Sequence, residues 1–153
     1  MKIKKIISRL LVDSITRSQS LGRIPVIESC DVIIDRPKIS EHGDFSTNLP
    51  LALSKVCRMP PKKISEIIIE HINSDPSIRS IEFAPPGFIN FFIENDYFYQ
   101  ELEKIQNDGL DYFRNNYGKK QKIQIEFVSV NPTGPLHVGH ARGAVIGLSL
   151  IHI

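Results

Sequence analysis

The sequence predicts an α+β domain followed by the first strand, loop and helix of an α/β domain. Several segments before residue 107 carry apolar residues at the spacing of one helical face. Two short runs that alternate apolar and polar residues flank a Pro-Gly pair, which is typical of a β-hairpin. A third alternating run leads into a loop rich in Gly and Pro and then into a segment of helix-tolerant composition.

Helices are expected in four segments of the α+β domain: 3–15, 49–56, 60–72 and 96–106. In the first, an apolar stripe runs from Ile3 to Ile15, and Gly22 lies beyond its end. Pro50 and Pro61 suit the first turns of the second and third helices, because a first-turn N–H has no partner within its own helix.

Strands are expected at 32–34, where Pro37 follows, and at 80–83 and 88–93. Pro86 and Gly87 predict a type II turn between the last two, since proline presets φ and glycine accepts a positive φ. The polar residues 42–48 are expected to form a loop that leads into the second helix. These elements place the α+β domain at 1–113, a polar linker at 114–121 and the start of the α/β domain at 122–147. A strand is expected at 123–128.

Composition excludes several classes of protein. The 153 residues are 41% hydrophobic and 24% charged, which is typical of a globular protein. The net charge of +2 is too small to indicate nucleic-acid binding without local clustering. No run of about 18 apolar residues is present, which argues against a membrane span. Cys30 and Cys57 lack the partners of a disulfide framework or a zinc site and are expected to be reduced thiols.

His137, Gly139 and His140 form the pattern H-x-G-H at the expected start of a helix. Two imidazoles there can face a phosphate chain, and the helix N-terminus adds free N–H groups and a partial positive charge. Gly139 has no Cβ, so a flat ligand can approach the backbone. The pattern predicts stabilisation of negative charge on a nucleotide phosphate. A metal pair or two surface histidines are the alternatives, although no carboxylate or third histidine lies close in the sequence.

The surroundings of this pattern resemble one known family. Residues 128–143 (VSVNPTGPLHVGHARG) resemble the signature region of bacterial arginyl-tRNA synthetases, which are class I enzymes. Residues 42–48 (HGDFSTN) and 86–92 (PGFINFF) resemble two characteristic stretches of that family's additional N-terminal domain, in the family's order and spacing. The resemblance implies an α+β N-terminal additional domain that contacts the elbow of tRNA, followed by the first βα unit of a Rossmann-like class I catalytic domain.

The resemblance also implies roles for individual residues. His137 and His140 match the catalytic histidines that bind the ATP phosphates, and Gly139 matches the glycine beneath the adenine. Ser129 and Asn131 match positions that touch the arginine substrate, with loop-forming polar residues as the alternative. The whole HIGH-type motif comprises Val130, Asn131, Pro132, Thr133, Gly134, Pro135, Leu136, His137, Val138, Gly139 and His140.

In the N-terminal domain the resemblance makes Phe45 and Asn48 expected tRNA contacts, with an ordinary role in the fold as the alternative. Phe88, Phe91 and Phe92 are expected to be core residues and not platforms for stacked bases.

The implied activity is that of an arginine–tRNA ligase. The carboxylate of L-arginine attacks the α-phosphate of ATP, which carries Mg²⁺, and the arginyl group then passes from arginyl-adenylate to tRNA(Arg). His137 and His140 act electrostatically in the first step. No protein-bound metal cofactor and no membrane association are expected, and the location is expected to be cytoplasmic. The full-length protein is expected to be monomeric.

The family continues for several hundred residues beyond this motif, so the chain is expected to be an N-terminal fragment that is inactive alone. In place of the acidic residue and charged helix of the family, residues 148–153 read LSLIHI. We expect these residues to be foreign to the gene, because a common sequencing-adaptor end can encode them.

Two other functions are open at this point. A nucleotidylyltransferase also carries an H-x-G-H pattern, but usually near its N-terminus and behind a Gly-rich first strand. ATP consumption with a phosphorylated cofactor precursor, independent of tRNA, would favour it. A non-catalytic tRNA-binding protein would use the α+β domain as a free module, which tRNA binding measured against salt concentration would test.

Overall fold

The computed structural model describes residues 2–27, 31–131 and 133–152 of the chain. Cys30, Pro132 and Ile153, which figure in the sequence predictions, lie outside the described residues. The chain forms two compact units, Met1–Gly109 and Leu110–Ile153. None of the helices in the described ranges is long and apolar enough to cross a membrane.

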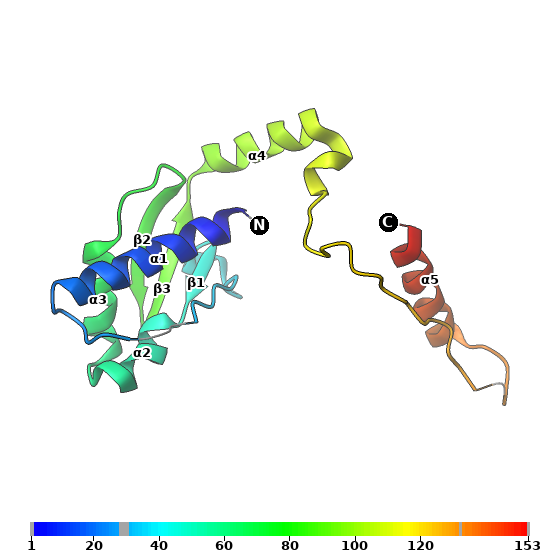
Figure 1. Cartoon of the computed structure of the whole chain (residues 1–153), viewed down its shortest axis with the longest axis horizontal. Helices are drawn as coiled ribbons and strands as arrows, with labels where there is room; N and C mark the ends of the chain where they lie inside the picture. The colour runs from blue at the N-terminus through cyan, green and yellow to red at the C-terminus, as the bar shows by residue number, and fades with distance from the viewer. Residues whose placement is uncertain (1, 28–30, 132, 153) are drawn as a thin grey trace. The chain divides into compact units, whose positions relative to one another are not determined.

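The first unit is an antiparallel sheet with helices packed on it (Figure 1). Its elements are α1 (Lys2–Ser20), the short 3₁₀ helix η1 (Ser40–His42), β1 (Phe45–Thr47), α2 (Leu49–Cys57), α3 (Pro61–His71), β2 (Ile78–Ala84), β3 (Phe88–Ile93) and α4 (Asn95–Asp108). The sheet has the order β1-β3-β2, and all its pairs are antiparallel. The expected α+β domain is therefore present.

The hydrophobic core lies between the sheet and helices α1, α2 and α3. Alternate residues of a strand face opposite sides of the sheet, and in β3 the buried set is Ile89, Phe91 and Ile93. From the helices the most deeply buried side chains are Ile3, Ile7, Leu11, Leu49, Ile64 and Ile68. The opposite face of β3 carries Phe88, Asn90 and Phe92, and this face is available to build a site.

All four helices expected in the first unit are confirmed, and the predicted hairpin is confirmed as β2 and β3. The prediction of a type II turn between them is wrong. The turn runs from Ala84 to Gly87, with a cis Pro85–Pro86 bond and a hydrogen bond of 3.1 Å from the Gly87 N–H to the Ala84 carbonyl. Gly87 does not have a positive φ. Its missing side chain matters because a Cβ there would lie 2.6 Å from the Cβ of Pro61.

The predictions for residues 32–48 need two corrections. The strand expected at 32–34 is absent from the described residues, and only the next residue, Asp35, forms an isolated bridge with Ser46. The expected loop 42–48 contains β1, which pairs with β3 in the register Phe45↔Phe91. A strand forms where hydrogen-bonding partners are available. Residues 45–47 pair with the edge of β3, whereas the preceding segment meets the outer edge of the short β1 only at Asp35.

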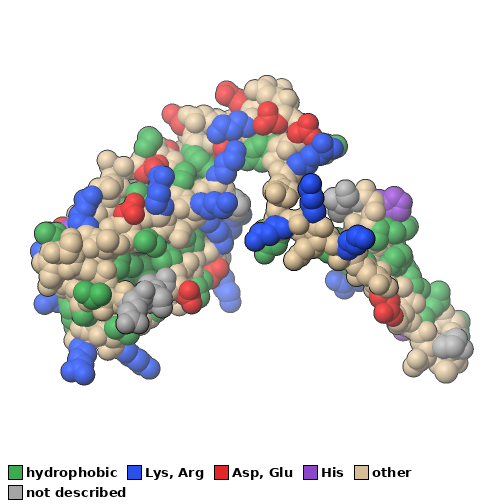
Figure 2. Space-filling view, in the orientation of Figure 1, with side chains coloured by type: hydrophobic (Ala, Val, Ile, Leu, Met, Phe, Trp, Pro, Cys, Tyr) green, Lys and Arg blue, Asp and Glu red, His purple; other side chains and the backbone are tan. Residues whose placement is uncertain are grey.

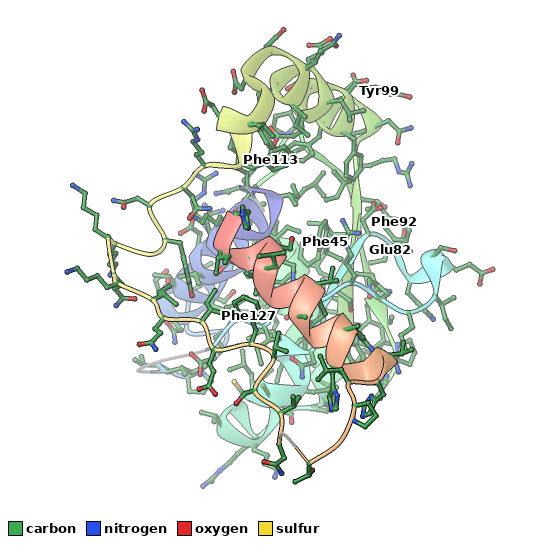
Figure 3. The ribbon with its side chains drawn as sticks, turned by 90° about the vertical axis from the view of Figure 1, so that its right-hand side faces the viewer. Phe45, Glu82, Phe92, Tyr99, Phe113 and Phe127 are labelled. Atoms are coloured by element: carbon green, nitrogen blue, oxygen red, sulfur yellow. The ribbon has the colours of Figure 1, made fainter. Side chains whose placement is uncertain are left out.

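In the second unit the structure contains α5 (Val138–His152), preceded along the chain by the 3₁₀ helix η2 (Gly109–Phe113). The strand expected at 123–128 is wrong: within the described residues this segment pairs with no other and is irregular. The expected Rossmann-like βα unit is therefore not present among the described residues, because its helix forms but its strand does not. Phe127 nevertheless packs on α5 (Figure 3), because a Cβ added to Gly147 would overlap its side chain. Residues 148–152 continue α5.

Candidate functional site

The first candidate site is the turn from loop into helix α5 at His137. The carbonyl of His137 accepts hydrogen bonds from the N–H groups of His140 (2.9 Å) and Ala141 (3.2 Å), which begin the helix. Its Nδ1 accepts a hydrogen bond of 3.1 Å from the Gly139 N–H, a donor that otherwise has no partner inside the helix. His137 is therefore the N-cap residue of α5.

The imidazole rings of His137 and His140 stack on each other. Their centroids are 3.7 Å apart and their planes differ by 24°. The His137 N–H donates a hydrogen bond of 3.3 Å to Nδ1 of His140. Each ring accepts through Nδ1, so the neutral form of each carries its proton on Nε2. The turn thus offers two adjacent N–H donors of the kind that bind phosphate oxygens.

Gly139 has a steric role in this turn that the sequence reasoning missed. A Cβ at this position would lie 3.0 Å from Cε1 and 3.1 Å from Nδ1 of His137. The absence of a side chain therefore lets the His137 ring reach the Gly139 N–H. The spacing from a histidine to a glycine two positions later, at a helix start, is the signal that could have indicated it.

Ser129 and Asn131 lie on the irregular segment before α5. Both are exposed, and the hydroxyl of Ser129 donates a hydrogen bond to the Glu126 carboxylate. Within the described residues neither hydrogen-bonds to His137 or His140. The structure therefore keeps these two predicted arginine contacts in the same unit as the histidines, without a hydrogen bond between the two pairs among the described residues.

The second candidate site is a pocket of about 320 Å³ in the first unit. It brings together the two stretches 42–48 and 86–92, because β1 and β3 are neighbours with Ser46 opposite Asn90. Its lining residues are Ile33, Asp35, Arg36, Pro37, His42, Ser46, Asn48, Ala84, Pro85, Phe88 and Asn90.

Asn90 is the unusual residue of this pocket. Only 5% of its surface is exposed, yet its side-chain amide has no hydrogen-bond partner among the described residues. Buried amides are nearly always hydrogen-bonded. Among the described residues, every side-chain polar atom that is fully inaccessible has a hydrogen-bond partner. Since the Asn90 amide has no partner, its polar atoms are still accessible, and they are reached through the pocket that Asn90 lines. The pocket therefore presents both a donor and an acceptor to a ligand.

The 42–48 segment is held on β3 by its backbone. Gly43 has φ 85°, and a Cβ there would lie 2.8 Å from the Phe91 carbonyl oxygen. The next N–H, of Asp44, donates to the same oxygen at 2.9 Å. This close approach places Ser46 and Asn48 at the pocket.

Phe45 requires a correction. It is 1% exposed and packs in the core, with the Arg36 guanidinium 5.8 Å from its ring centre, so its side chain is not available to a partner. Asn48 is exposed and lines the pocket, and its role stays a prediction. Phe91 is a core residue as expected. For Phe88 and Phe92 the core prediction is wrong, because neither belongs to the core cluster. Phe88 is half-buried and lines the pocket, and the half-buried Phe92 has its ring centre 5.7 Å from the Arg79 guanidinium.

Comparison with known proteins gives one consistent result. Residues 1–93 match the family model described as the arginyl tRNA synthetase N terminal domain. An arginine–tRNA ligase of Legionella pneumophila (strain Corby) is 45% identical over 97% of this chain and 25% of its own length. One from Ruminiclostridium cellulolyticum is 41% identical over 95% of this chain and 26% of its own. The chain thus spans about a quarter of the length of these relatives.

A solved structure gives the same answer. The crystal structure of arginyl-tRNA synthetase from Plasmodium falciparum matches 97% of this chain and 27% of its own, with a TM-score of 0.64 and 27% sequence identity.

Proposed function

The chain belongs to the arginyl-tRNA synthetase family, and we propose on that basis that it forms the N-terminal region of an arginine–tRNA ligase. Such an enzyme joins L-arginine to tRNA(Arg) and converts ATP to AMP and pyrophosphate. The observation that carries the proposal is the stacked pair His137 and His140 at the first turn of α5. Residues 1–113 are the tRNA-contacting domain, 114–121 the linker and 122–147 the start of the catalytic domain.

In the proposed reaction His137 and His140 bind the phosphates of ATP. Negative charge moves onto the phosphate oxygens as the carboxylate of arginine attacks the α-phosphate and pyrophosphate leaves. Two Nε2–H donors, together with the N-terminus of α5, stabilise that charge more than the charge of the ground state. Mg²⁺ enters with ATP as part of the substrate, and no residue of this chain is assigned to it.

The other nucleotide and amino-acid contacts rest on the family resemblance. Gly139 lies beneath the adenine, and its exposed backbone supports this role. Ser129 and Asn131 contact arginine, and both side chains are exposed and polar. The buried free thiol of Cys57 is consistent with a reducing compartment, and we place the protein in the cytoplasm. The full-length protein acts as a monomer.

The catalytic proposal is tested with a chimera. Residues 1–147 replace the corresponding region of the 45%-identical ligase, and transfer of labelled arginine to tRNA(Arg) is measured. We expect an active chimera whose kcat falls about 100-fold or more in His140→Ala, the effect of removing one charge-stabilising donor. His71→Ala, on α3 in the other unit, is the control and should retain activity. An active chimera that His140→Ala leaves unchanged would refute the role.

The pocket is the proposed tRNA contact of the first unit. An unpaired nucleotide can be recognised by hydrogen bonds to its base edge and by contact with an aromatic ring. Asn90 offers the free amide, Phe88 the partly exposed ring, and Asn48 a polar group at the rim. The elbow of tRNA, which the resemblance assigns to this domain, carries such unpaired nucleotides in its loops.

Binding of tRNA(Arg) to the 153-residue chain tests this contact. Asn90→Ala is expected to weaken binding about 10-fold, because the loss of a hydrogen bond to a buried partner costs about 1–3 kcal/mol. Asn73→Ala, an exposed asparagine outside the pocket, is the matched control. Equal affinities of the two variants would show that tRNA does not bind in this pocket.

A further inference from the structure

A second concave surface of the first unit is a groove between α1 and residues 32–34. It encloses about 540 Å³ and is open to solvent along its length. Its lining residues are Lys4, Lys5, Ser8, Arg9, Val12, Asp13, Val32 and Ile34. Basic side chains gather around the start of α1 (Figure 2). The lining set contains three cations and one acid, so the groove is positively charged.

The three cations are held to different degrees. Lys4 donates a hydrogen bond of 2.5 Å from Nζ to the Ile34 carbonyl, which ties α1 to the other wall of the groove. Arg9 lies 4.0 Å from the Asp75 carboxylate, but 67% of its side chain is exposed, and such a pair is weak. Lys5 is exposed. Lys5 and Arg9 are one helical turn apart and can therefore act on one ligand together.

These charges conflict with the preferences of the helix that carries them. The first turn of α1 contains no acidic residue and has Lys2, Lys4 and Lys5 instead. Cations are unfavourable at this end of a helix dipole, and the like charges of Lys5 and Arg9 repel. Local conflicts of this kind are typical of functional surfaces. A polyanion in the groove would remove both penalties.

The groove and the pocket share one wall. Val32 and Ile34 line the groove, whereas Ile33 and Asp35 line the pocket, so alternate residues of one segment serve the two sites. A ligand that occupies the pocket with one nucleotide therefore has this basic surface within its reach.

We propose that the groove binds the sugar-phosphate backbone of the tRNA whose unpaired nucleotide enters the pocket. Lys5 and Arg9 contact phosphates, whereas Lys4 is a positioning residue that holds the two walls of the groove together through its bond to Ile34. This inference rests on the proposed function, since it takes tRNA as the partner. The groove adds to the proposed function a second contact with tRNA, which is independent of sequence, beside the pocket that recognises a base.

The experiment measures the affinity of the 153-residue chain for tRNA(Arg) over a range of salt concentrations. A contact between a cation and a phosphate contributes about 0.7–0.9 to the slope of log K against log salt. The double variant Lys5→Ala/Arg9→Ala is expected to lower the slope by about 1.5 and the affinity in 0.1 M salt by at least about 10-fold. The control is Lys62→Ala/Lys63→Ala in the first turn of α3, which removes the same charge from exposed positions outside the groove. It should lower both the salt slope and the affinity much less than the groove variant does.

The outcomes separate the two proposals. If the wild-type chain binds tRNA but the two double variants behave alike, the groove proposal fails and the pocket stands. If the wild-type chain does not bind tRNA, both fail. Arg9→Ala also removes the Asp75 pair, so Lys5→Ala alone, which breaks no interaction of the described residues, serves as the second variant. An unchanged slope in Lys5→Ala would likewise overturn the assignment.

Discussion

The carboxylate of Asp44 accepts a hydrogen bond of 2.8 Å from the backbone N–H of Ile93, across 49 residues of sequence. This bond joins the residue before β1 to the end of β3. Together with the Asp44 N–H, which donates to the Phe91 carbonyl, it fixes the loop that leads into the pocket. The stretch 42–48 therefore has a structural role, whatever it binds.

Asp44→Ala is expected to lower the free energy of unfolding by about 1–3 kcal/mol, because the N–H of Ile93, a residue only 2% exposed, then loses its acceptor. Asp44→Asn keeps an acceptor oxygen and should recover part of the loss. Urea unfolding followed by circular dichroism measures both. Glu41→Ala, at an exposed position of η1, is the control, and an equal loss there would show that the bond contributes nothing.

Gly43→Ala is expected to destabilise the first unit more than Gly22→Ala does. Gly43 has φ 85° and ψ −172°, a region essentially restricted to glycine, and its Cβ would meet the Phe91 carbonyl. Gly22 also has a positive φ, of 67°, but nothing lies within 4 Å of its Cβ position. We expect a loss of about 1 kcal/mol for Gly22→Ala and of about 3 kcal/mol for Gly43→Ala in urea unfolding. Equal losses would mean that the contact with β3 relaxes at no cost.

Helices were predictable from the sequence because their apolar stripes report burial directly. The stripes from Ile3 to Ile15 and from Ile64 to Ile72 both lie on the core side. The hairpin was predictable for the same reason, because apolar residues alternate with polar ones along its strands. The role of Gly87 was not, because it depends on Pro61 and Leu51, which are distant in sequence.

Strand β1 and the place of Phe45 could not be predicted in the same way. Three residues are too few for a period, and the polar neighbours of Phe45 favoured a loop. The alternation appears only in the structure, where Phe45 and Thr47 are buried on either side of Ser46. At the candidate catalytic site the sequence predicted the helix start and the pairing of the histidines. It did not predict that His137 caps the helix, since that depends on ring orientation.

Gly147→Ala is expected to separate residue 127 from α5. Alanine favours a helix by about 1 kcal/mol over glycine, but here its Cβ would overlap the Phe127 side chain. Gly143 lies in the same helix with nothing within 4 Å of its Cβ position, so Gly143→Ala should raise the helix content of α5. Backbone chemical shifts report both changes. The double variant Gly147→Ala/Phe127→Gly removes the overlapping side chain, including its Cβ, and should also raise the helix content. A gain from Gly147→Ala alone would contradict the packing.

Cys57 is expected to react slowly with iodoacetamide. Burial raises the pKa of its thiol above the ordinary value of 9.0, so less thiolate is present in the folded chain at a given pH. In a Cys30→Ser background at pH 8, alkylation should be at least about 10-fold slower than in the urea-unfolded chain. An equal rate would show that the thiol is accessible and ionises normally.

The same shift has a consequence for stability. Because the folded-state pKa of Cys57 is raised, the unfolded chain loses this proton first as the pH rises through 9.0, and the folded state is disfavoured above that value. Below it the thiol is neutral in both states and contributes no pH dependence. The fall in unfolding free energy above pH 9.0 should therefore be smaller in Cys57→Ser, as measured by urea unfolding at several pH values. Identical pH profiles for the two proteins would contradict the shift.

Gly139→Ala is expected to displace the His137 ring from its capping position. The new Cβ would lie 3.0 Å from Cε1 of that ring, so the hydrogen bond from the residue 139 N–H to Nδ1 is strained or lost. The cap contributes about 0.5–2 kcal/mol to the start of the helix, which opposes the gain of about 1 kcal/mol from replacing glycine by alanine. Imidazole nitrogen shifts of the 153-residue chain measure the result. In the wild type, Nδ1 of neutral His137 should be unprotonated, and in Gly139→Ala the ring should show a mixture of both tautomers. Gly143→Ala should leave the His137 shifts unchanged, and the absence of any difference in Gly139→Ala would show that the ring does not depend on the glycine.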